Sequence, residues 1–180
     1  RCKPSKLYAL DFSEPMIQSA TDILRLVAPS VEVFVGNVCE IALPDESLDV
    51  CYAIRVIINL PTWELQLKAI SECLRVTKPG GQVILSEGFW EPLSKLNSLR
   101  TLMGLDPLVE HDFNRYIKRE RLRDWLDSKK LHYEITDYSS VYYLGSRLVR
   151  ELATDFSRFE GYSNPINSEF AQLARKYKTC

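Results

Sequence analysis

The amino-acid sequence predicts an α/β fold with a mostly parallel β-sheet. The first observation is that strand-like and helix-like segments alternate from Leu7 to Ser86. The second is that the connections between these segments are short, as in chains where each helix returns the backbone to a neighbouring parallel strand. The third is composition, because 180 residues with 46% hydrophobic content can bury one core. We therefore expect a single domain.

The first strand and the first helix are predicted by the signals at their ends. Residues Leu7–Leu10 form a short apolar run that Asp11 ends, which is typical of a strand. Ser13 and Pro15 follow at once, and these residue types are preferred at a helix N-cap and in the first helical turn. Apolar residues then recur at helical spacing until Pro29, where we expect the helix to end.

Three further strands are predicted along the first half of the chain. The segments are Val31–Val35, Asp49–Ile58 and Gln82–Ser86. The second is rich in β-branched and aromatic residues, as expected for a strand that is buried on both faces. A helix is predicted over residues 62–76, because its apolar residues fall on one stripe. The run Lys78–Gly81 contains proline and two glycines, so it should break that helix.

Beyond Phe89 the pattern predicts more helix than sheet. A mixed helix is expected to about Leu105, and a second helix is expected over Arg119–Ser128. The aromatic segment Tyr133–Tyr143 is predicted to be a strand or one arm of a hairpin. The residues after it have a helical pattern, and we find no internal repeat in the sequence.

Charge, hydropathy and cysteine usage argue against several classes of protein. The formal net charge is -1, from 23 basic and 24 acidic residues, so no broad positive surface is expected for nucleic acid. No apolar run reaches the roughly 18 residues that a membrane span needs, and the first residues do not lead into a signal peptide. The five cysteines form an odd set without a C-x-x-C pair. This predicts a reduced, cytoplasmic protein without a metal site.

Three pieces of sequence stand out by their order and spacing. They are Leu7–Ser13, Gly36–Val50 and Leu74–Val83. The first is a strand that ends in an acidic residue, the second is a turn and loop that lead into a strand, and the third is a helix-to-strand turn with two adjacent glycines. Together they resemble the class I methyltransferases that use S-adenosylmethionine, and the methyltransferase type 11 group in particular.

The resemblance implies a three-layer, Rossmann-like methyltransferase fold with S-adenosylmethionine as the cofactor. Asp11 would accept hydrogen bonds from both ribose hydroxyls, with Phe12 beside it in the cofactor site. Asn37 and the backbone N–H of Val38 would contact the adenine. Family members usually carry aspartate at the position of Asn37, and an amide oxygen is a weaker acceptor than a carboxylate. The alternatives are that Asp11 only caps the next helix and that the loop is a surface turn.

The sequence departs from this family at its beginning. Family members open with a strand and a glycine-rich loop that carries the methionine portion of the cofactor, upstream of the strand that ends in Asp11. No such loop is present in this sequence, which begins with Arg1 rather than methionine. We expect a longer natural protein, because a parallel sheet without its middle strand leaves unpaired backbone groups that are unfavourable to bury.

Four further residues are site candidates: Ile54 and Arg55 for cofactor binding, where Arg55 would bind the cofactor's carboxylate or an acidic substrate, and Glu87 and His111 for catalysis on the acceptor side. Ile54 and Arg55 should lie at the carboxyl end of a strand, beside the sulfur-bearing arm of the cofactor. Glu87 follows the next strand and is a candidate base. His111 lies in the segment Glu110–Tyr116, where this family tends to build its substrate cover, and imidazole is suited to proton removal near neutral pH. The plainer alternatives are a salt bridge for Arg55 and a surface position without a role for His111.

The residues and the resemblance together predict methyl transfer from S-adenosylmethionine to a small-molecule acceptor. Residues 1–90 would be the cofactor-binding half and residues 91–180 the substrate-side half of one domain. Two alternatives stay open. A NAD-dependent dehydrogenase would also place an acidic residue such as Asp11 on ribose, although the other two pieces do not belong to that class. A non-catalytic, methyltransferase-like binding module is favoured by the absence of the glycine-rich loop.

Overall fold

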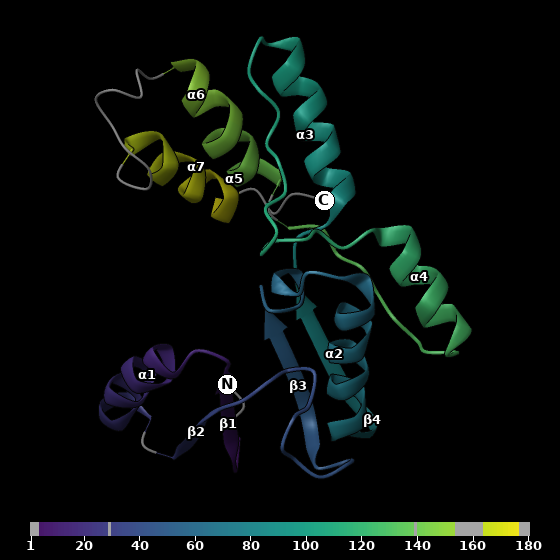
Figure 1. Ribbon diagram of the computed structural model, residues 1–180. Helices are drawn as coiled ribbons and strands as arrows, with labels where there is room; N and C mark the ends of the chain where they lie inside the picture. The colour runs from purple at the N-terminus through teal and green to yellow at the C-terminus, as the bar shows by residue number, and fades with distance from the viewer. Residues whose placement is uncertain (1–3, 29, 139, 154–163, 177–180) are drawn as a thin grey trace. The chain divides into compact units, whose positions relative to one another are not determined.

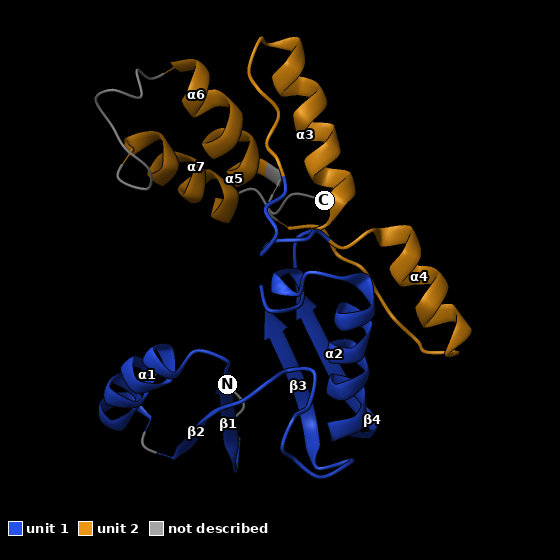
Figure 2. Ribbon diagram, viewed as in Figure 1, with its two compact units in different colours: residues 1–88, 110–116 blue, residues 89–109, 117–180 orange. Residues whose placement is uncertain are grey.

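Strands and helices alternate through the first half of the chain in the computed structural model, as the sequence predicts (Figure 1). The structure describes residues 4–28, 30–138, 140–153 and 164–176. The chain divides into two units, drawn in different colours in Figure 2. Unit 1 comprises Arg1–Gly88 and Glu110–Tyr116, and unit 2 comprises Phe89–Val109 and Ile117–Cys180.

Unit 1 contains two βαβ segments. Its elements are β1 (Leu7–Asp11), α1 (Glu14–Val27), β2 (Val31–Val35), β3 (Leu48–Ile54), the 3₁₀ helix η1 (Ile57–Asn59), α2 (Trp63–Val76) and β4 (Thr77–Ser86). Both helices begin at a side-chain cap: Ser13 Oγ accepts from the N–H of Met16, and Thr62 Oγ1 accepts from the N–H of Leu65. These caps satisfy N–H groups that have no partner within the helix. The two predicted helix starts are therefore confirmed.

The strands pair in parallel, but they form two separate ladders. β1 pairs with β2 from Leu7↔Val31 to Asp11↔Val35, and β3 pairs with β4 as far as Ile54↔Ser86. The predicted parallel pairing is confirmed. The expected single sheet is not formed, because no strand among the described residues joins β1 to β3. In the part of the chain that the structure describes, β1 is therefore paired only with β2, and β3 is paired only with β4.

The predicted strand over Asp49–Ile58 is too long at its carboxyl end. The backbone of Arg55 has a φ of 55°, in the left-handed region that strands do not use. The 3₁₀ helix follows directly, so β3 ends at Ile54. Near the other end of β3, a Cβ on Gly81 of β4 would lie 2.8 Å from the carbonyl oxygen of Asp49. Only glycine allows this approach.

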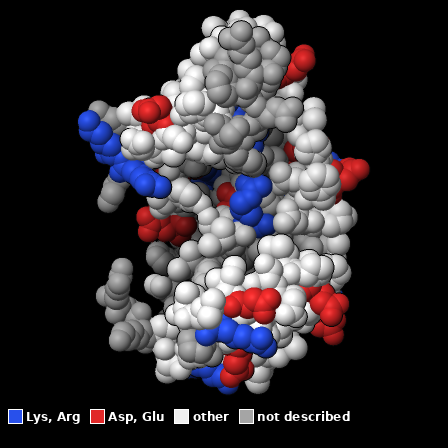
Figure 3. Space-filling view, turned by 90° about the vertical axis from the view of Figure 1, so that its left-hand side faces the viewer, with Lys and Arg blue, Asp and Glu red and all other residues white. Residues whose placement is uncertain are grey.

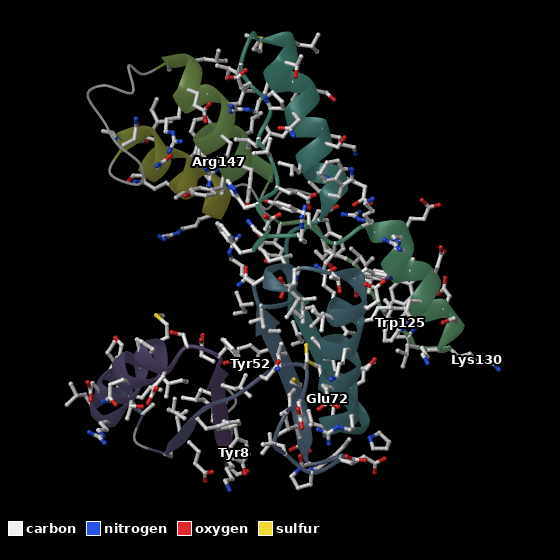
Figure 4. The ribbon with its side chains drawn as sticks, in the orientation of Figure 1. Tyr8, Tyr52, Glu72, Trp125, Lys130 and Arg147 are labelled. Atoms are coloured by element: carbon white, nitrogen blue, oxygen red, sulfur yellow. The ribbon has the colours of Figure 1, made fainter. Side chains whose placement is uncertain are left out.

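Helix α2 covers one face of the β3–β4 ladder (Figure 1). The core there contains Ile41, Cys73 and Val76, with Val38, Leu43, Leu48, Cys51 and Val83 packed against them. Successive side chains of a strand point to opposite faces, so Tyr52 and its register partner Ile84 lie on the other face (Figure 4). They are 57% and 51% exposed. This apolar face is therefore open in the described structure.

Unit 2 is helical in its described part. Its helices are α3 (Trp90–Leu102), α4 (Arg119–Ser128), α5 (Ser140–Leu144), the π-helix η2 (Gly145–Val149), α6 (Arg150–Ala153) and α7 (Pro165–Lys176). The predicted helix over Arg119–Ser128 is confirmed. The predicted strand or hairpin over Tyr133–Tyr143 is wrong: the backbone is irregular to Tyr138, and Tyr142 and Tyr143 lie in α5. A strand needs a partner for its backbone groups, and no described residue pairs with this segment.

Charged side chains of both signs share the surface drawn in Figure 3. Lys and Arg side chains lie among Asp and Glu side chains on this face, in keeping with the nearly balanced composition of the chain. Within the described residues, no helix combines the length and the apolar character that crossing a membrane requires.

Candidate functional site

The carboxyl ends of β1 and β2 bring two predicted cofactor residues to one edge. Asp11 is the last residue of β1 and is in register with Val35, the last residue of β2. The backbone N–H of Gly36 donates to the carbonyl oxygen of Asp11 at 2.9 Å. Asn37 follows Gly36, so it lies close to Asp11. In parallel α/β sheets, ligands bind at this end of the strands.

The Asp11 carboxylate has a local structural partner and is also exposed. Its Oδ1 accepts a hydrogen bond from the backbone N–H of Ser13 at 2.8 Å. The helix-capping alternative is therefore present in the structure. A carboxylate has about four acceptor positions on two oxygens, so this one bond leaves capacity for a ligand diol. The neighbouring Phe12 is 79% exposed and offers an apolar ring at the same edge.

The Asn37 side chain shapes the turn that follows β2. Its Oδ1 accepts from the backbone N–H of Cys39 at 2.9 Å, and its carbonyl oxygen accepts from the N–H of Glu40 at 2.9 Å. The predicted adenine acceptor is thus already engaged in an Asx turn, with one lone pair remaining. Val38 is half-buried and packs on the core cluster below α2. The adenine roles of Asn37 and Val38 remain predictions.

A cluster of ion pairs and hydrogen bonds holds the loop between β2 and β3 against α2. The guanidinium of Arg75 donates to the carbonyl oxygens of Ile41 and Leu43, at 2.8 and 3.0 Å. It also pairs with Asp45 at 2.6 Å and with Glu72 at 2.7 Å. Glu72, labelled in Figure 4, accepts from the N–H of Ile41 at 2.9 Å. The loop that follows Asn37 is therefore fixed by side chains of a distant helix.

Sequence reasoning missed Glu72 and Arg75 as residues of this region. They are spaced i, i+3 on α2, which places them side by side on the helix surface. That spacing is a visible signal, but it does not tell which loop the pair would hold. Arg75 lowers the pKa of the Glu72 carboxyl chiefly through their hydrogen bond, and the N–H of Ile41 adds to this effect.

Replacing Glu72 with glutamine should reduce stability at neutral pH and have less effect in acid. Because folding lowers the pKa of Glu72, the ionised group stabilises the fold above its unfolded-state pKa. This contribution is lost as the pH falls through the folded-state pKa, below about 4.5. Urea unfolding of both proteins at several pH values, followed by Trp63 fluorescence in a Trp90→Phe/Trp125→Phe background, measures the difference within unit 1.

The matched control for this prediction is Glu120→Gln, which removes an exposed carboxylate on α4 in the other unit. The control should not change the urea midpoint of Trp63 at any pH. A stability difference between wild type and Glu72→Gln that stays constant from neutral pH to pH 3 would show that ionisation of Glu72 does not stabilise the loop.

The carboxyl ends of β3 and β4 bring Arg55 and Glu87 to a second edge. The N–H of Arg55 donates to the carbonyl oxygen of Ser86 at 3.0 Å, and Glu87 follows Ser86 directly. The carbonyl oxygen of Arg55 accepts from Asn59 Nδ2 at 2.8 Å. A left-handed backbone at a residue other than glycine is unfavourable, and such positions are frequent at functional sites. The exposed Arg55 and Ile54 are thus presented at a sharp turn.

The Glu87 carboxylate points into the turn that follows β3. Its Oε1 accepts from the N–H groups of Val56 and Ile57, both at 3.0 Å, and its Oε2 accepts from Ile58 at 3.3 Å. Burial raises the pKa of Glu87 above the usual value. The three N–H groups and the positive charge of Arg55 act in the opposite direction, but the effect of burial is larger.

His111 lies on an exposed turn that belongs to unit 1. Its ring stacks on Phe113, with the ring centroids 5.2 Å apart and an interplanar angle of 4°. The segment is anchored by Arg115, whose N–H donates to the carbonyl oxygen of Ile58 at 2.6 Å. His111 is therefore connected through a short stretch of backbone to η1, the element that Glu87 holds.

The structure groups the predicted residues into two edges and one turn. Asp11 lies with Asn37, and Arg55 lies with Glu87. The hydrogen bonds of the Asp11 and Asn37 side chains given above stay within the first edge, and those of the Glu87 side chain go to the turn after β3. In the same part of the chain, no three His, Cys, Asp or Glu side chains are grouped so that they could hold a metal ion.

Comparison with known sequences finds a family match in the first half of the chain. Residues 1–85 match the Methyltransf_11 family, described as a methyltransferase domain. A Mycolicibacterium smegmatis protein named "Probable S-adenosylmethionine-dependent methyltransferase" is 36% identical over 81 residues, which are 45% of this chain and 29% of that protein. The ubiquinone biosynthesis O-methyltransferase of Alkalilimnicola ehrlichii is 29% identical over 152 residues, covering 72% of this chain and 60% of the enzyme. This chain spans less than a third of the length of the first relative.

Comparison with solved structures extends the similarity of fold beyond that half. The YcgJ protein of Bacillus subtilis has a TM-score of 0.55 at 19% identity, over 85% of this chain and 70% of that protein. A SAM-dependent methyltransferase from Methanosarcina mazei has a TM-score of 0.53 at 19% identity, over 68% of each chain. The parallel βαβ segments and these likenesses define a Rossmann-like α/β protein. Residues 1–85 match a methyltransferase domain, and over that part the chain is similar to S-adenosylmethionine-dependent methyltransferases.

Proposed function

We propose that this chain takes part in the transfer of a methyl group from S-adenosylmethionine to a small-molecule acceptor, within a cytoplasmic protein. The observation that carries the proposal is the match of residues 1–85 to a methyltransferase domain. The edge formed by β1 and β2 supports it, because it brings together Asp11 and Asn37, for which the family resemblance implies contacts with ribose and adenine.

The chemistry of the first edge suits the nucleoside part of the cofactor. The exposed Asp11 carboxylate can accept from two neighbouring hydroxyls, which a ribose offers as donors. Gly36, between Asp11 and Asn37, packs closely on Leu10: a Cβ on Gly36 would lie 2.7 Å from the Leu10 side chain. The exposed ring of Phe12 adds apolar surface for the adenosine. These residues would hold the cofactor from one side.

The second edge suits the acceptor side of the reaction. When bound, S-adenosylmethionine supplies a methyl group on a positively charged sulfur. The protein has to align the acceptor, exclude water and, for some acceptors, remove a proton. Ile54 would give an apolar wall and Arg55 a positive charge for an acidic group. Glu87 and His111 remain the candidate bases, and Glu87 keeps acceptor capacity on Oε2 beside its bond to Ile58.

A small-molecule acceptor is favoured by the relatives and by the charge of the chain. The name of the Alkalilimnicola ehrlichii relative assigns that protein to ubiquinone biosynthesis, whose intermediates are small molecules. The net charge of -1 offers no general attraction for nucleic acid. The relatives also favour methyl transfer over the dehydrogenase alternative, because the family match includes the two pieces of sequence that dehydrogenases lack.

Calorimetric titration with S-adenosylhomocysteine, the product form of the cofactor, tests this proposal. We expect the 180-residue chain to bind it with a Kd in about the micromolar range. Titration with NAD under the same conditions is the control, and we expect no binding. Tighter binding of NAD would favour the dehydrogenase alternative. A folded chain that binds neither ligand would favour the non-catalytic, methyltransferase-like module.

A further inference from the structure

We infer that Glu87 is a positioning residue: its carboxylate holds η1 and, through Ile58 and Arg115, the segment Glu110–Tyr116 that carries His111. The inference rests on the proposed function, because the proposed function assigns this segment to the acceptor side of the site. It also gives Glu87 a role different from that of a base.

The first step is that η1 needs an acceptor from outside its own backbone. The N–H groups at the start of a helix have no partner within it, and Val56 provides no side-chain cap. Ile57 and Ile58 are both 0% exposed, so water does not reach them. The Glu87 carboxylate accepts from all three N–H groups at 3.0 to 3.3 Å. Without it the N–H groups of Ile57 and Ile58 would be buried without partners, which is strongly unfavourable.

The second step leads from η1 to the segment with His111. The carbonyl oxygen of Ile58, whose N–H Glu87 holds, accepts from the N–H of Arg115 at 2.6 Å. The carbonyl oxygen of Arg115 in turn accepts from Nε2 of the buried Gln66 on α2, at 2.8 Å. The backbone of Arg115 is therefore held on both sides, by the backbone of Ile58 and by the side chain of Gln66. One of those two bonds depends on the position of η1.

The third step is a direct contact beside Glu87. The ring of Tyr116 lies so close to Gly88 that a Cβ on Gly88 would be 2.7 Å from the ring. The N–H of Tyr116 donates to Glu110 Oε1 at 2.6 Å, which closes the segment on itself. Two sets of contacts thus join the chain after β4 to the segment: an indirect set, from the Glu87 carboxylate through η1, and a direct contact of Gly88 with the Tyr116 ring. Glu87 sets the first of these contacts.

Hydrogen exchange and NMR of Glu87→Ala and Glu87→Gln, without ligand, test the inference. In Glu87→Ala we expect the amides of Val56, Ile57 and Ile58 to exchange about tenfold faster or more, and the amide of Arg115 to follow them. The ring-proton signals of His111 should move toward those of exposed His132, the other histidine of the chain, as the stack on Phe113 loosens. The changes in Glu87→Gln should be smaller, since its amide keeps one acceptor oxygen.

Two controls and one contrary outcome make this experiment decisive. Amides of the β3–β4 ladder, such as that of Ala53, should exchange at the same rate in all variants, which separates a local change from general loss of stability. Glu120→Gln, on α4 of the other unit, should leave every signal of unit 1 unchanged. An Arg115 amide or a His111 signal that stays as in the wild type in Glu87→Gln and Glu87→Ala would overturn the inference, even if the amides of η1 exchange faster.

The proposed function is tested separately. Because exchange and histidine signals are measured without ligand, they report on positioning whether or not the chain binds S-adenosylhomocysteine. If the wild type fails to bind that ligand while Glu87→Ala shows the expected exchange, the proposed function is wrong and the positioning by Glu87 stands. If the wild type binds S-adenosylhomocysteine but amide exchange is unchanged in the variants, the proposed function stands and the positioning role of Glu87 is wrong.

Discussion

Replacing Asp11 with alanine is expected to weaken the binding of S-adenosylhomocysteine by about tenfold or more. The carboxylate lies at the carboxyl end of β1, where it can accept charge-assisted hydrogen bonds from the two ribose hydroxyls. Alanine removes both acceptor oxygens and the charge. Calorimetric titration of the two proteins measures the change in Kd.

Two variants separate the ligand role of Asp11 from its role at the start of α1. Asp11→Asn keeps an oxygen for the N–H of Ser13 but removes the charge, so we expect an affinity between those of wild type and Asp11→Ala. Asp22→Ala removes an exposed carboxylate from the middle of α1 and should leave the affinity unchanged. If Asp11→Ala bound the ligand as tightly as the wild type, Asp11 would be a helix cap only.

Replacing Arg100 with methionine is expected to destabilise unit 2 by about 3 to 5 kcal/mol, the usual effect of breaking a buried ion pair. Arg100 is 4% exposed on α3, and its guanidinium pairs with Glu151 of α6 at 2.7 Å. It also donates to the carbonyl oxygens of Asp106 and Arg147. Methionine fills part of the volume but takes the closest cation from the half-buried Glu151 carboxylate, which keeps only the longer pair with Arg150 at 3.8 Å. Urea unfolding, followed by Trp90 fluorescence in a Trp63→Phe/Trp125→Phe background, measures the loss.

Lys95→Met is the matched control for this prediction, because Lys95 is an exposed cation on the same helix. It should change the free energy of unfolding by less than about 0.5 kcal/mol. A similar small change in Arg100→Met would mean that the pair with Glu151 contributes no net stability. A double variant that also carries Glu151→Leu should recover part of the loss, since it removes the carboxylate that has lost its closest cation.

The elements with strong local signals could be predicted from the sequence. Helix α1 begins after Ser13 and ends before Pro29 because a cap and a proline act within one or two turns. Helix α4 occupies Arg119–Ser128 as predicted. The strand predicted over Tyr133–Tyr143 is wrong because it depended on a distant partner and not on a local signal. Aromatic residues fit a strand only when a partner strand exists, and local sequence does not show whether one does.

Part of the candidate site could also be predicted from the sequence, and part could not. A residue that ends a parallel strand lies at the carboxyl edge of the ladder, so the sequence could place Asp11 and Glu87 there. The sequence could not show that Glu87 binds the N–H groups of Val56 to Ile58, which lie 29 to 31 residues earlier. Nor could it show that Arg75 reaches the carbonyl oxygens of Ile41 and Leu43.

The sequence by itself determined the order of strands and helices, the parallel pairing and the family resemblance, because these depend on periodicity, caps and spacing along the chain. Only the tertiary structure decided which loops the charged side chains hold. Glu72 and Arg75 act on the loop after β2, Glu87 acts on η1, and Arg100 acts on Glu151. A carboxylate or guanidinium binds whatever backbone group or ion folding brings within hydrogen-bond distance, and that distance is set by packing rather than by position in the chain.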